Sequence, residues 1–386
     1  MKKSDRQPLR ITRLALENWR NFSRVDISLR GRVFLVGPNA SGKSNFLDAV
    51  RFLRDIVAVG GGFQDAVQKR GGVTRLRCLA ARRYPDIRLQ MDLGNDANPG
   101  LWRYQVSFTQ DNRQRPLVRE EAASGNGSTF LKRPDGSDNS DPERLSQTYL
   151  EQVSLNQPFR EVAEFLRSVR YLHIVPQLVR EPDRSVGRAN DPFGGDFLDQ
   201  VARTPSRTRD ARLRRITEAL KVAVPQLEEL ELRSDVRGTP HLRGKYVHWR
   251  PQGAWQTESD FSDGTLRLLG LLWAMLDGSG PLLLEEPELS LHPEVVRHLP
   301  QTFARMQHRS GRQVFVSTQS PDLLQDQGIG LDEIFLLQPN EEGTVVSTGS
   351  DIFEIGNLLG AGSSLADVVM PLTQPKWAHQ LPLFSR

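Results

Sequence analysis

The segment GPNASGKS, at residues 37–44, constrains the fold of this chain more than any other feature of its sequence. It follows the apolar run VFLV at 33–36 and precedes residues 45–59, where apolar side chains recur at helical spacing. The pattern GxxxxGK[ST] between a strand and a helix is typical of a phosphate-binding loop. Its glycines let backbone N–H groups turn toward phosphate, and the N-terminus of the next helix adds positive charge. We therefore predict that this loop binds a nucleotide.

The loop assigns roles to individual side chains. In a loop of this kind the lysine, here Lys43, reaches the β- and γ-phosphates, and the hydroxyl of Ser44 ligates Mg²⁺. The predicted nucleotide-binding residues within the pattern are Gly37, Ala40, Ser41, Gly42, Lys43 and Ser44. Mg²⁺ is therefore the metal that we expect beside the nucleotide.

A second apolar run, PLLL at 281–284, ends in the acids Glu285 and Glu286. One acid at the end of such a strand can hold the Mg²⁺ shell, and the next can polarise an attacking water. Adjacent carboxylates at the carboxyl edge of a parallel sheet would lie where α/β proteins bind their ligands. The alternative is a strand followed by a solvated acidic turn. The phosphate loop in the same chain favours the catalytic interpretation, with Glu285 at the metal and Glu286 in catalysis.

Strand and helix patterns alternate at both ends of the chain, and this predicts an α/β protein. Strands are expected at 11–16, 25–29, 33–36, 281–285, 313–318 and 331–337, and helices at 45–59, 264–277 and 293–308. In the middle of the chain we expect strands in IRLQMDL, LWRYQVSF and STFLKRP, helices at 159–169 and 208–224, and a β-like region at 228–258. The stretch 135–142 has almost no apolar residue, so we expect a mobile loop there.

Four further segments occur in an informative order. LALENWRNF lies near the start, SDGT at 262–265 precedes an apolar helix, ELSLHP follows the acids, and STQSP at 317–321 follows the next strand. This set resembles the ABC-type ATPase heads of the RecF, SMC and OLD-like group, including the predicted ATPases filed as AAA_21 or AAA15. The resemblance implies a P-loop NTPase fold of ABC-ATPase type. We expect a core from 1–60 and 255–350, a β-rich and helical insertion at 61–254, and a C-terminal segment at 351–386.

The resemblance also implies further site residues. Asn39 and Asn45 join the loop that binds ATP, and Ser262, Asp263 and Gly264 form the signature motif. In this superfamily the signature contacts the γ-phosphate bound to the other protomer, so each chain supplies half of a site in an ATP-dependent homodimer. A serine hydroxyl, a glycine N–H group and a helix N-terminus together suit an anion. A plain helix cap is the alternative for these residues.

Three more residues take roles from the same resemblance. Gln177, in YLHIVPQL, matches the Q-loop glutamine that completes the Mg²⁺ and water shell, although an ordinary glutamine after a strand is the alternative. His292, in LHP, matches the segment that packs across the dimer, or is a surface histidine. Arg70, in KRGG, is a weaker candidate for a basic finger near the γ-phosphate.

Two positions depart from the family pattern. The metal-holding acid is usually aspartate, but here it is Glu285, whose extra methylene moves the carboxylate toward the metal. The switch residue is usually histidine, but here it is Gln319, which can hydrogen-bond the γ-phosphate without carrying a proton charge near neutral pH. We therefore predict that Lys43, Glu286 and Gln319 act in a slow hydrolysis reaction, suited to a switch more than to a motor.

The length and sequence pattern of the chain exclude several subgroups of these ATPases. The section between Lys43 and Ser262 has no sustained heptads, which excludes the long coiled coil of SMC proteins. About 65 residues follow STQSP, too few for the TOPRIM nuclease domain of OLD-type proteins. There is no apolar run of membrane-spanning length and no signal-peptide pattern, and Cys78 is the single cysteine. We expect a cytoplasmic protein without membrane contact.

Arginine accounts for 43 of the 51 basic residues, and it clusters in two places. One cluster comprises Arg203, Arg207, Arg209, Arg212, Arg214 and Arg215, and the other comprises Arg75, Arg77, Arg82, Arg83 and Arg88. Such clusters could neutralise DNA phosphates. Solvated helix faces with local acidic partners, and a compositional bias of the source genome, are the alternatives.

Three functions are compatible with these observations. The first is a slow ATPase that dimerises on ATP and controls a DNA-directed activity, in antiphage defence or DNA repair, with a separately encoded effector such as a nuclease. The second is a nucleotide sensor that barely hydrolyses ATP and restrains a partner protein. The third is a RecF-like DNA-binding clamp that needs no nuclease partner.

Overall fold

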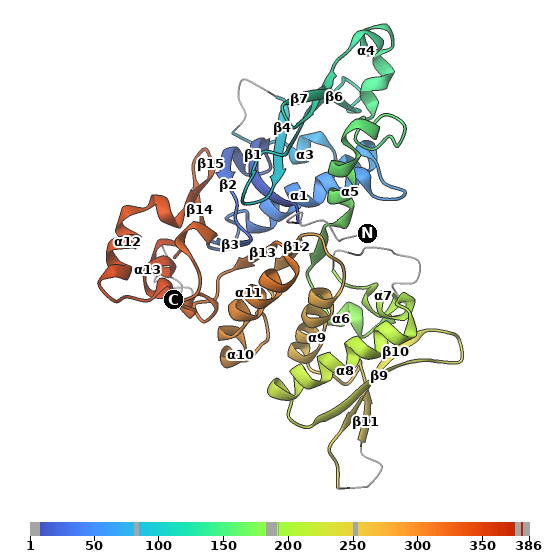
Figure 1. Ribbon diagram of the computed structural model, residues 1–386, viewed down its shortest axis with the longest axis vertical. Helices are drawn as coiled ribbons and strands as arrows, with labels where there is room; N and C mark the ends of the chain where they lie inside the picture. Colours follow the sequence, from blue (N-terminus) through green and yellow to red (C-terminus); the bar gives the residue numbers. More distant parts are fainter. Residues whose placement is uncertain are drawn as a thin grey trace.

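The computed structural model describes residues 8–80, 85–182, 191, 193–249, 254–374 and 380. Its elements form three sheets with helices packed between and around them (Figure 1). Among these residues, we find no helix with the length and apolarity needed to cross a bilayer.

A six-stranded sheet carries the phosphate loop at its centre. Its strand order is β15-β14-β3-β13-β12-β8, and all neighbouring pairs are parallel except β14 with β15. The strands are β3 (Arg32–Val36), β8 (Arg170–Leu172), β12 (Leu282–Glu285), β13 (Val314–Thr318), β14 (Ile334–Asn340) and β15 (Gly343–Thr348). The central strands are nearly continuous apolar runs, as expected for a sheet that is covered on both faces.

Alternate residues of these strands face two different hydrophobic cores. Leu35 and Leu283 join one core, whereas Phe34 and Leu284 join the other, because successive side chains of a strand point to opposite faces. The first core lies between this sheet and an antiparallel one, with helix α1 (Lys43–Val57) buried between them. The second core lies under the remaining helices.

The antiparallel sheet occupies the upper part of Figure 1 and has the order β2-β1-β4-β5-β6-β7. Its strands are β1 (Arg10–Trp19), β2 (Phe22–Ser28), β4 (Ile87–Gly94), β5 (Trp102–Gln110), β6 (Pro116–Gly125) and β7 (Ser128–Arg133). The helices α2 (Phe63–Gln68), α3 (Val73–Leu76), α4 (Gly136–Ser140) and α5 (Arg160–Ser168) accompany it.

Helices cover the other face of the parallel sheet, and a small third sheet packs against two of these helices. The helices are α6 (Pro176–Val179), α7 (Phe197–Arg203), α8 (Ser206–Ala223), α9 (Asp263–Leu276), α10 (Pro293–Arg297), α11 (Leu299–Ser310), α12 (Phe353–Gly360) and α13 (Leu365–Leu372). The sheet has the order β11-β10-β9, with β9 (Leu227–Ser234), β10 (Pro240–Tyr246) and β11 (Ala254–Thr257). Together these elements form the lower lobe of Figure 1 and the C-terminal lobe at its left.

The predicted α/β pattern at both chain ends is confirmed, but individual segments differ. The strand expected at 331–337 begins with a 3-10 helix at Leu331–Glu333, before β14. The expected helix at 293–308 is two helices, since Pro300, which has no N–H group, begins a new helix instead of continuing the first. The expected mobile loop at 135–142 is wrong, because Asp135 and Asp138 form a capping box at α4. Asp138 also pairs with Arg133 at 2.8 Å, with both side chains fully buried.

The strand order runs across the predicted domain ranges. Strands β1 and β2, from the range 1–60, share a sheet with β4 to β7, from the range 61–254. Strand β8, also from 61–254, is the edge strand of the parallel sheet next to β12. The ranges stay a prediction about domain organisation, and the middle of the chain contributes strands to both large sheets.

Candidate nucleotide site

The phosphate loop joins β3 to α1 through left-handed backbone conformations. Ala40 and Gly42 have φ angles of 61° and 99°. A Cβ atom on Gly42 would collide with the side chain of Asn21, and one on Gly37 would lie 2.6 Å from the Ser41 hydroxyl. Both glycines are therefore required by close approach, and Gly42 by its backbone conformation as well.

The turn between β1 and β2 braces this loop. The Asn21 amide donates to the Ser41 carbonyl at 2.9 Å and to the Thr344 hydroxyl at 2.7 Å. Its oxygen accepts from the Asn45 amide at 2.7 Å, and the Trp19 indole donates to the Asn45 carbonyl at 2.8 Å. The WRNF segment thus connects the loop to both large sheets. No pattern in the sequence indicated this bracing role.

Lys43 is held by the loop itself. Its Nζ donates to the carbonyls of Gly37 at 2.9 Å and Pro38 at 3.2 Å, and it lies 3.8 Å from the Glu286 carboxylate. Burial lowers the pKa of Lys43, while Glu286, Glu288 and Glu285 oppose that shift. Lys43 is therefore fixed by the loop that is predicted to bind phosphate, beside Glu286.

Ser44 and Glu285 meet at the predicted metal position. The Ser44 hydroxyl donates to one carboxylate oxygen of Glu285, and the Tyr171 hydroxyl donates to the other. Hydroxyl and carboxylate oxygens are the ligand types that Mg²⁺ prefers, and it usually completes its shell with water and substrate phosphates. The pair therefore fits Mg²⁺ bound together with a nucleotide.

Glu286 sits where β12 and β13 end side by side. Its φ angle is 42°, and its N–H group donates to the Ser317 carbonyl at 3.0 Å and the Ser317 hydroxyl at 3.2 Å. The Gln319 amide donates to its carboxylate at 3.3 Å. The structure thus brings Lys43, Glu286 and Gln319 to one edge of the sheet, as the sequence predicted from three distant segments.

Glu288 is a neighbour that the sequence did not single out. It is buried and accepts from the Thr318 hydroxyl, which in turn accepts from the Ser320 N–H group at 3.0 Å. Burial raises the pKa of Glu288 to about 7. Glu288 therefore connects the acidic segment to the residues on both sides of Gln319.

Ser262 caps α9, where its hydroxyl accepts from the Thr265 N–H group at 3.1 Å. Gly264 has no room for a side chain, because a Cβ atom would collide with the Ser290 carbonyl. Asp263 pairs with Arg180 at 2.6 Å. Arg180 directly follows the short helix α6, which carries the exposed Gln177. The segment 262–264 is therefore packed against Ser290, in the segment after Glu286, and an ion pair ties it to the segment that carries Gln177.

His292 and Arg70 have structural partners. The ring Nδ1 of His292 accepts from the Glu294 N–H group at 3.2 Å and caps α10. Arg70 is buried and binds Asp48 at 2.8 Å and Asp55 at 2.9 Å. Its guanidinium thus fastens α1 to the segment after α2, so the structure does not support the prediction of a basic finger at the γ-phosphate.

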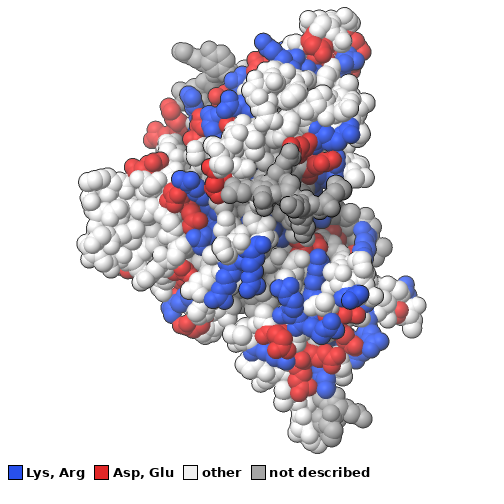
Figure 2. All heavy atoms as spheres, viewed as in Figure 1, with Lys and Arg blue, Asp and Glu red and all other residues white. Residues whose placement is uncertain are grey.

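The arginine clusters are partly neutralised. Arg212 pairs with Asp277 at 2.9 Å and lies over the Trp273 ring, and Arg88 pairs with Glu120 at 3.0 Å. Figure 2 shows basic and acidic side chains interspersed over the lower lobe. The exposed arginines of α8 are Arg207, Arg214 and Arg215, and Arg82 and Arg83 lie outside the described residues.

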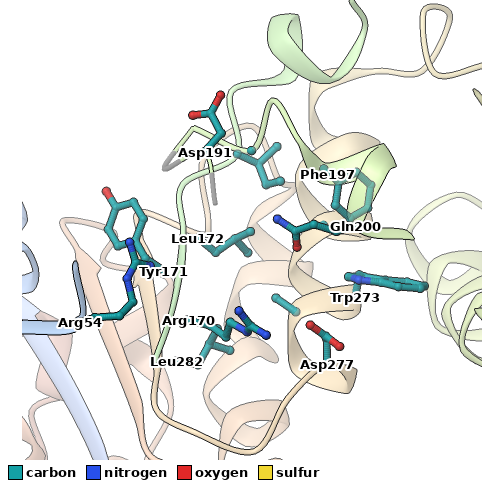
Figure 3. Close-up of a pocket in the computed structure, with 14 residues that line it drawn as sticks. Arg54, Arg170, Tyr171, Leu172, Asp191, Phe197, Gln200, Trp273, Asp277 and Leu282 are labelled. Atoms are coloured by element: carbon teal, nitrogen blue, oxygen red, sulfur yellow. The ribbon is translucent and has the colours of Figure 1, made fainter. Parts of the chain in front are cut away.

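A small cavity lies beside the site, between β8, α7 and α9 (Figure 3). Its volume of about 50 Å³ is far below the several hundred Å³ of a ligand pocket, so it is too small to hold a nucleotide. Tyr171 lies at its edge with the hydroxyl turned away from the cavity.

Comparisons with known proteins agree with this geometry. Residues 32–325 match the model of the AAA_21 family, described as "AAA domain, putative AbiEii toxin, Type IV TA system". No curated protein matches the chain.

Solved structures of SMC heads share the fold. An SMC head bound to the C-terminal winged-helix domain of ScpA is 13% identical, with a TM-score of 0.54, over 88% of this chain and 97% of that one. A head with coiled coil and joint from Pyrococcus yayanosii is 11% identical, with a TM-score of 0.51, over 91% of this chain and 100% of that one. The fold is that of an ABC-type P-loop ATPase head, and the chain belongs to the AAA_21 family.

Proposed function

We propose that this protein is an ATP-dependent switch that binds MgATP, hydrolyses it slowly and controls a separately encoded effector. The observation that carries the proposal is the convergence of Lys43, Ser44, Glu285, Glu286 and Gln319 at the carboxyl edge of one parallel sheet. Lys43 would bind phosphate, Ser44 and Glu285 would hold Mg²⁺, Glu286 would polarise the attacking water and Gln319 would orient toward the γ-phosphate. Mg²⁺ would supply charge neutralisation on the phosphates.

Slow hydrolysis is part of this proposal. Gln319 cannot carry a proton charge, and its amide engages Glu286. We expect a measurable steady-state rate that Glu286→Gln abolishes while ATP binding persists, and Lys43→Ala to lose nucleotide binding altogether. Full ATP affinity in Lys43→Ala would refute the loop assignment.

A sensor that does not hydrolyse ATP is the second candidate, and the same Gln319–Glu286 contact favours it. The two candidates separate in a hydrolysis assay with and without duplex DNA. A rate stimulated by DNA supports the ATPase that controls a DNA-directed activity. A rate near zero under all conditions, with tight ATP binding, supports the sensor.

The signature segment supports a dimer with composite sites. The Ser262 side chain is exposed at the start of the 14-residue helix α9, and Gly264 packs against Ser290. In this arrangement the helix N-terminus can receive the γ-phosphate of a second copy. Each chain would then supply the loop of one site and the signature of the other.

The proposed effector is a separately encoded protein. An SMC head is bound to a ScpA domain in one solved structure, and the AAA_21 description names a type IV TA system. These names support a protein partner and a role in defence, and DNA repair is the alternative role. We expect the effector to be a nuclease. Purification of the protein from its native operon, with and without ATP, tests this proposal, and Lys43→Ala is purified in parallel. We expect a partner protein that is retained only by the ATP-bound wild type. The absence of a partner under every condition would contradict the proposal.

A further inference from the structure

Glu285 is held at two points. Its two carboxylate oxygens accept from different hydroxyls, Ser44 on α1 and Tyr171 on β8. Strand β8 lies directly beside β12, with Tyr171 in register with Leu283. The contact to Tyr171 is therefore built by the sheet itself and not by a loop.

Tyr171 is fixed for this contact. Its ring lies under the Arg51 guanidinium at 4.8 Å, and Arg51 pairs with Asp48 at 3.0 Å. Because an ionised carboxylate can only accept, the phenolic O–H group of Tyr171 is the donor in this hydrogen bond.

We propose that Tyr171 is a positioning residue matched to Glu285, and that it orients the longer carboxylate so that Ser44 and Glu285 bind Mg²⁺ together. The inference rests on the proposed MgATP site. A glutamate has one more rotatable bond than the aspartate usual at this position, so its carboxylate needs a second anchor to stay in place. Groups that orient a metal ligand from behind typically contribute about 10- to 100-fold to metal affinity.

The test compares ATP affinity with Mg²⁺ and with EDTA, using a fluorescent ATP analogue. The ratio of the two affinities measures what the metal contributes, independently of turnover. For Tyr171→Phe we expect the ratio to fall about tenfold with the affinity in EDTA unchanged. Tyr149→Phe is the matched control, since it loses a hydroxyl bonded to Arg144 and Asp135 in the other lobe. An unchanged ratio in Tyr171→Phe would overturn the inference, and so would equal losses in both conditions, which indicate a merely structural role.

The pairing is tested in a second background. In Glu285→Asp the shorter carboxylate cannot span both hydroxyls, so adding Tyr171→Phe should change the ratio less than about twofold. A further fall of about tenfold in the double variant would contradict the pairing. A wild type whose affinity does not depend on Mg²⁺ would instead contradict the proposed function, so the two failures are distinguishable.

Discussion

At the residue scale, the site is pre-arranged by hydrogen bonds that lie behind the residues expected to touch the nucleotide. Asn21 holds the phosphate loop, Tyr171 holds Glu285, and Glu288 holds the segment around Gln319. All three lie in segments that the sequence analysis quoted, but none of them was given a role there. Their roles follow from which strands are neighbours, and that order is not written in any local pattern.

Glu288 makes stability depend on pH. Its folded-state pKa is raised from 4.5 to about 7, so between these values the folded protein keeps a proton that the unfolded chain has lost. The stability that this group contributes therefore falls as the pH rises through that window. The total fall is a few kcal/mol, because each tenfold change in proton affinity corresponds to about 1.4 kcal/mol. Glu288→Gln keeps an acceptor for Thr318 without ionising.

We expect Glu288→Gln to melt at a higher temperature than the wild type at about pH 8, with the difference shrinking toward about pH 5. Thermal melting across this range measures it, and Glu342→Gln, at an exposed position, is the control. A variant that melts below the wild type by the same margin at both pH values would contradict the account of Glu288.

At the element scale, local patterns predicted most helices and strands, but not which strands pair or which elements pack together. The apolar run at 33–36 and the helical spacing after it predicted β3 and α1, because both are buried and periodic. Strands β6 and β15 were missed, since their polar or mixed residues show no clear alternation. The prediction of a mobile loop at 135–142 was wrong because Asp138 pairs with the buried Arg133, a contact that composition does not reveal.

The candidate site, too, could be predicted only in part from the sequence. Lys43, Ser44, Glu285 and Glu286 were identified because their spacing follows from phosphate and metal chemistry. Arg70 was misplaced, since its two aspartate partners lie on α1 and only the packing of the segment after α2 against that helix brings them together. Sequence spacing therefore predicted the candidate site residues, whereas the residues that hold them in place could be recognised only from tertiary packing.

The bracing of the phosphate loop can be tested at this scale. Asn21 joins the β1–β2 turn to the loop and to β15 through three hydrogen bonds, each of about 0.5–1.5 kcal/mol. Asn21→Ala should weaken ATP binding on the order of tenfold, because the loop loses its fixed shape. Asn139→Ala, at an exposed position in α4, should bind ATP like the wild type. Unchanged affinity in Asn21→Ala, measured by titration with a fluorescent ATP analogue, would show that the brace is dispensable.

At the scale of the whole molecule, two parts of the predicted site belong to different layers. One is the sheet edge that carries Lys43, and the other is helix α9, which begins at the predicted signature motif. The phosphate loop follows β3 of the parallel sheet, whereas α9 belongs to the lower lobe. Arg180, after the helix that carries Gln177, pairs with Asp263 of α9. A nucleotide bound at Lys43 could therefore change how the lower lobe presents Ser262. This arrangement suits a protein whose output is association with a second copy.

The mass of the Glu286→Gln protein, measured by light scattering with and without MgATP, tests the central claim most directly. We predict that MgATP converts it from the 43.6 kDa chain to a species of twice that mass. Adding Ser262→Arg should leave ATP binding intact and keep the protein a monomer. Adding Ser310→Arg, at the end of α11 before β13 and so at the opposite edge of the sheet, should still permit the dimer. If the Ser262→Arg protein dimerises with MgATP as Glu286→Gln does, the composite-site account is wrong.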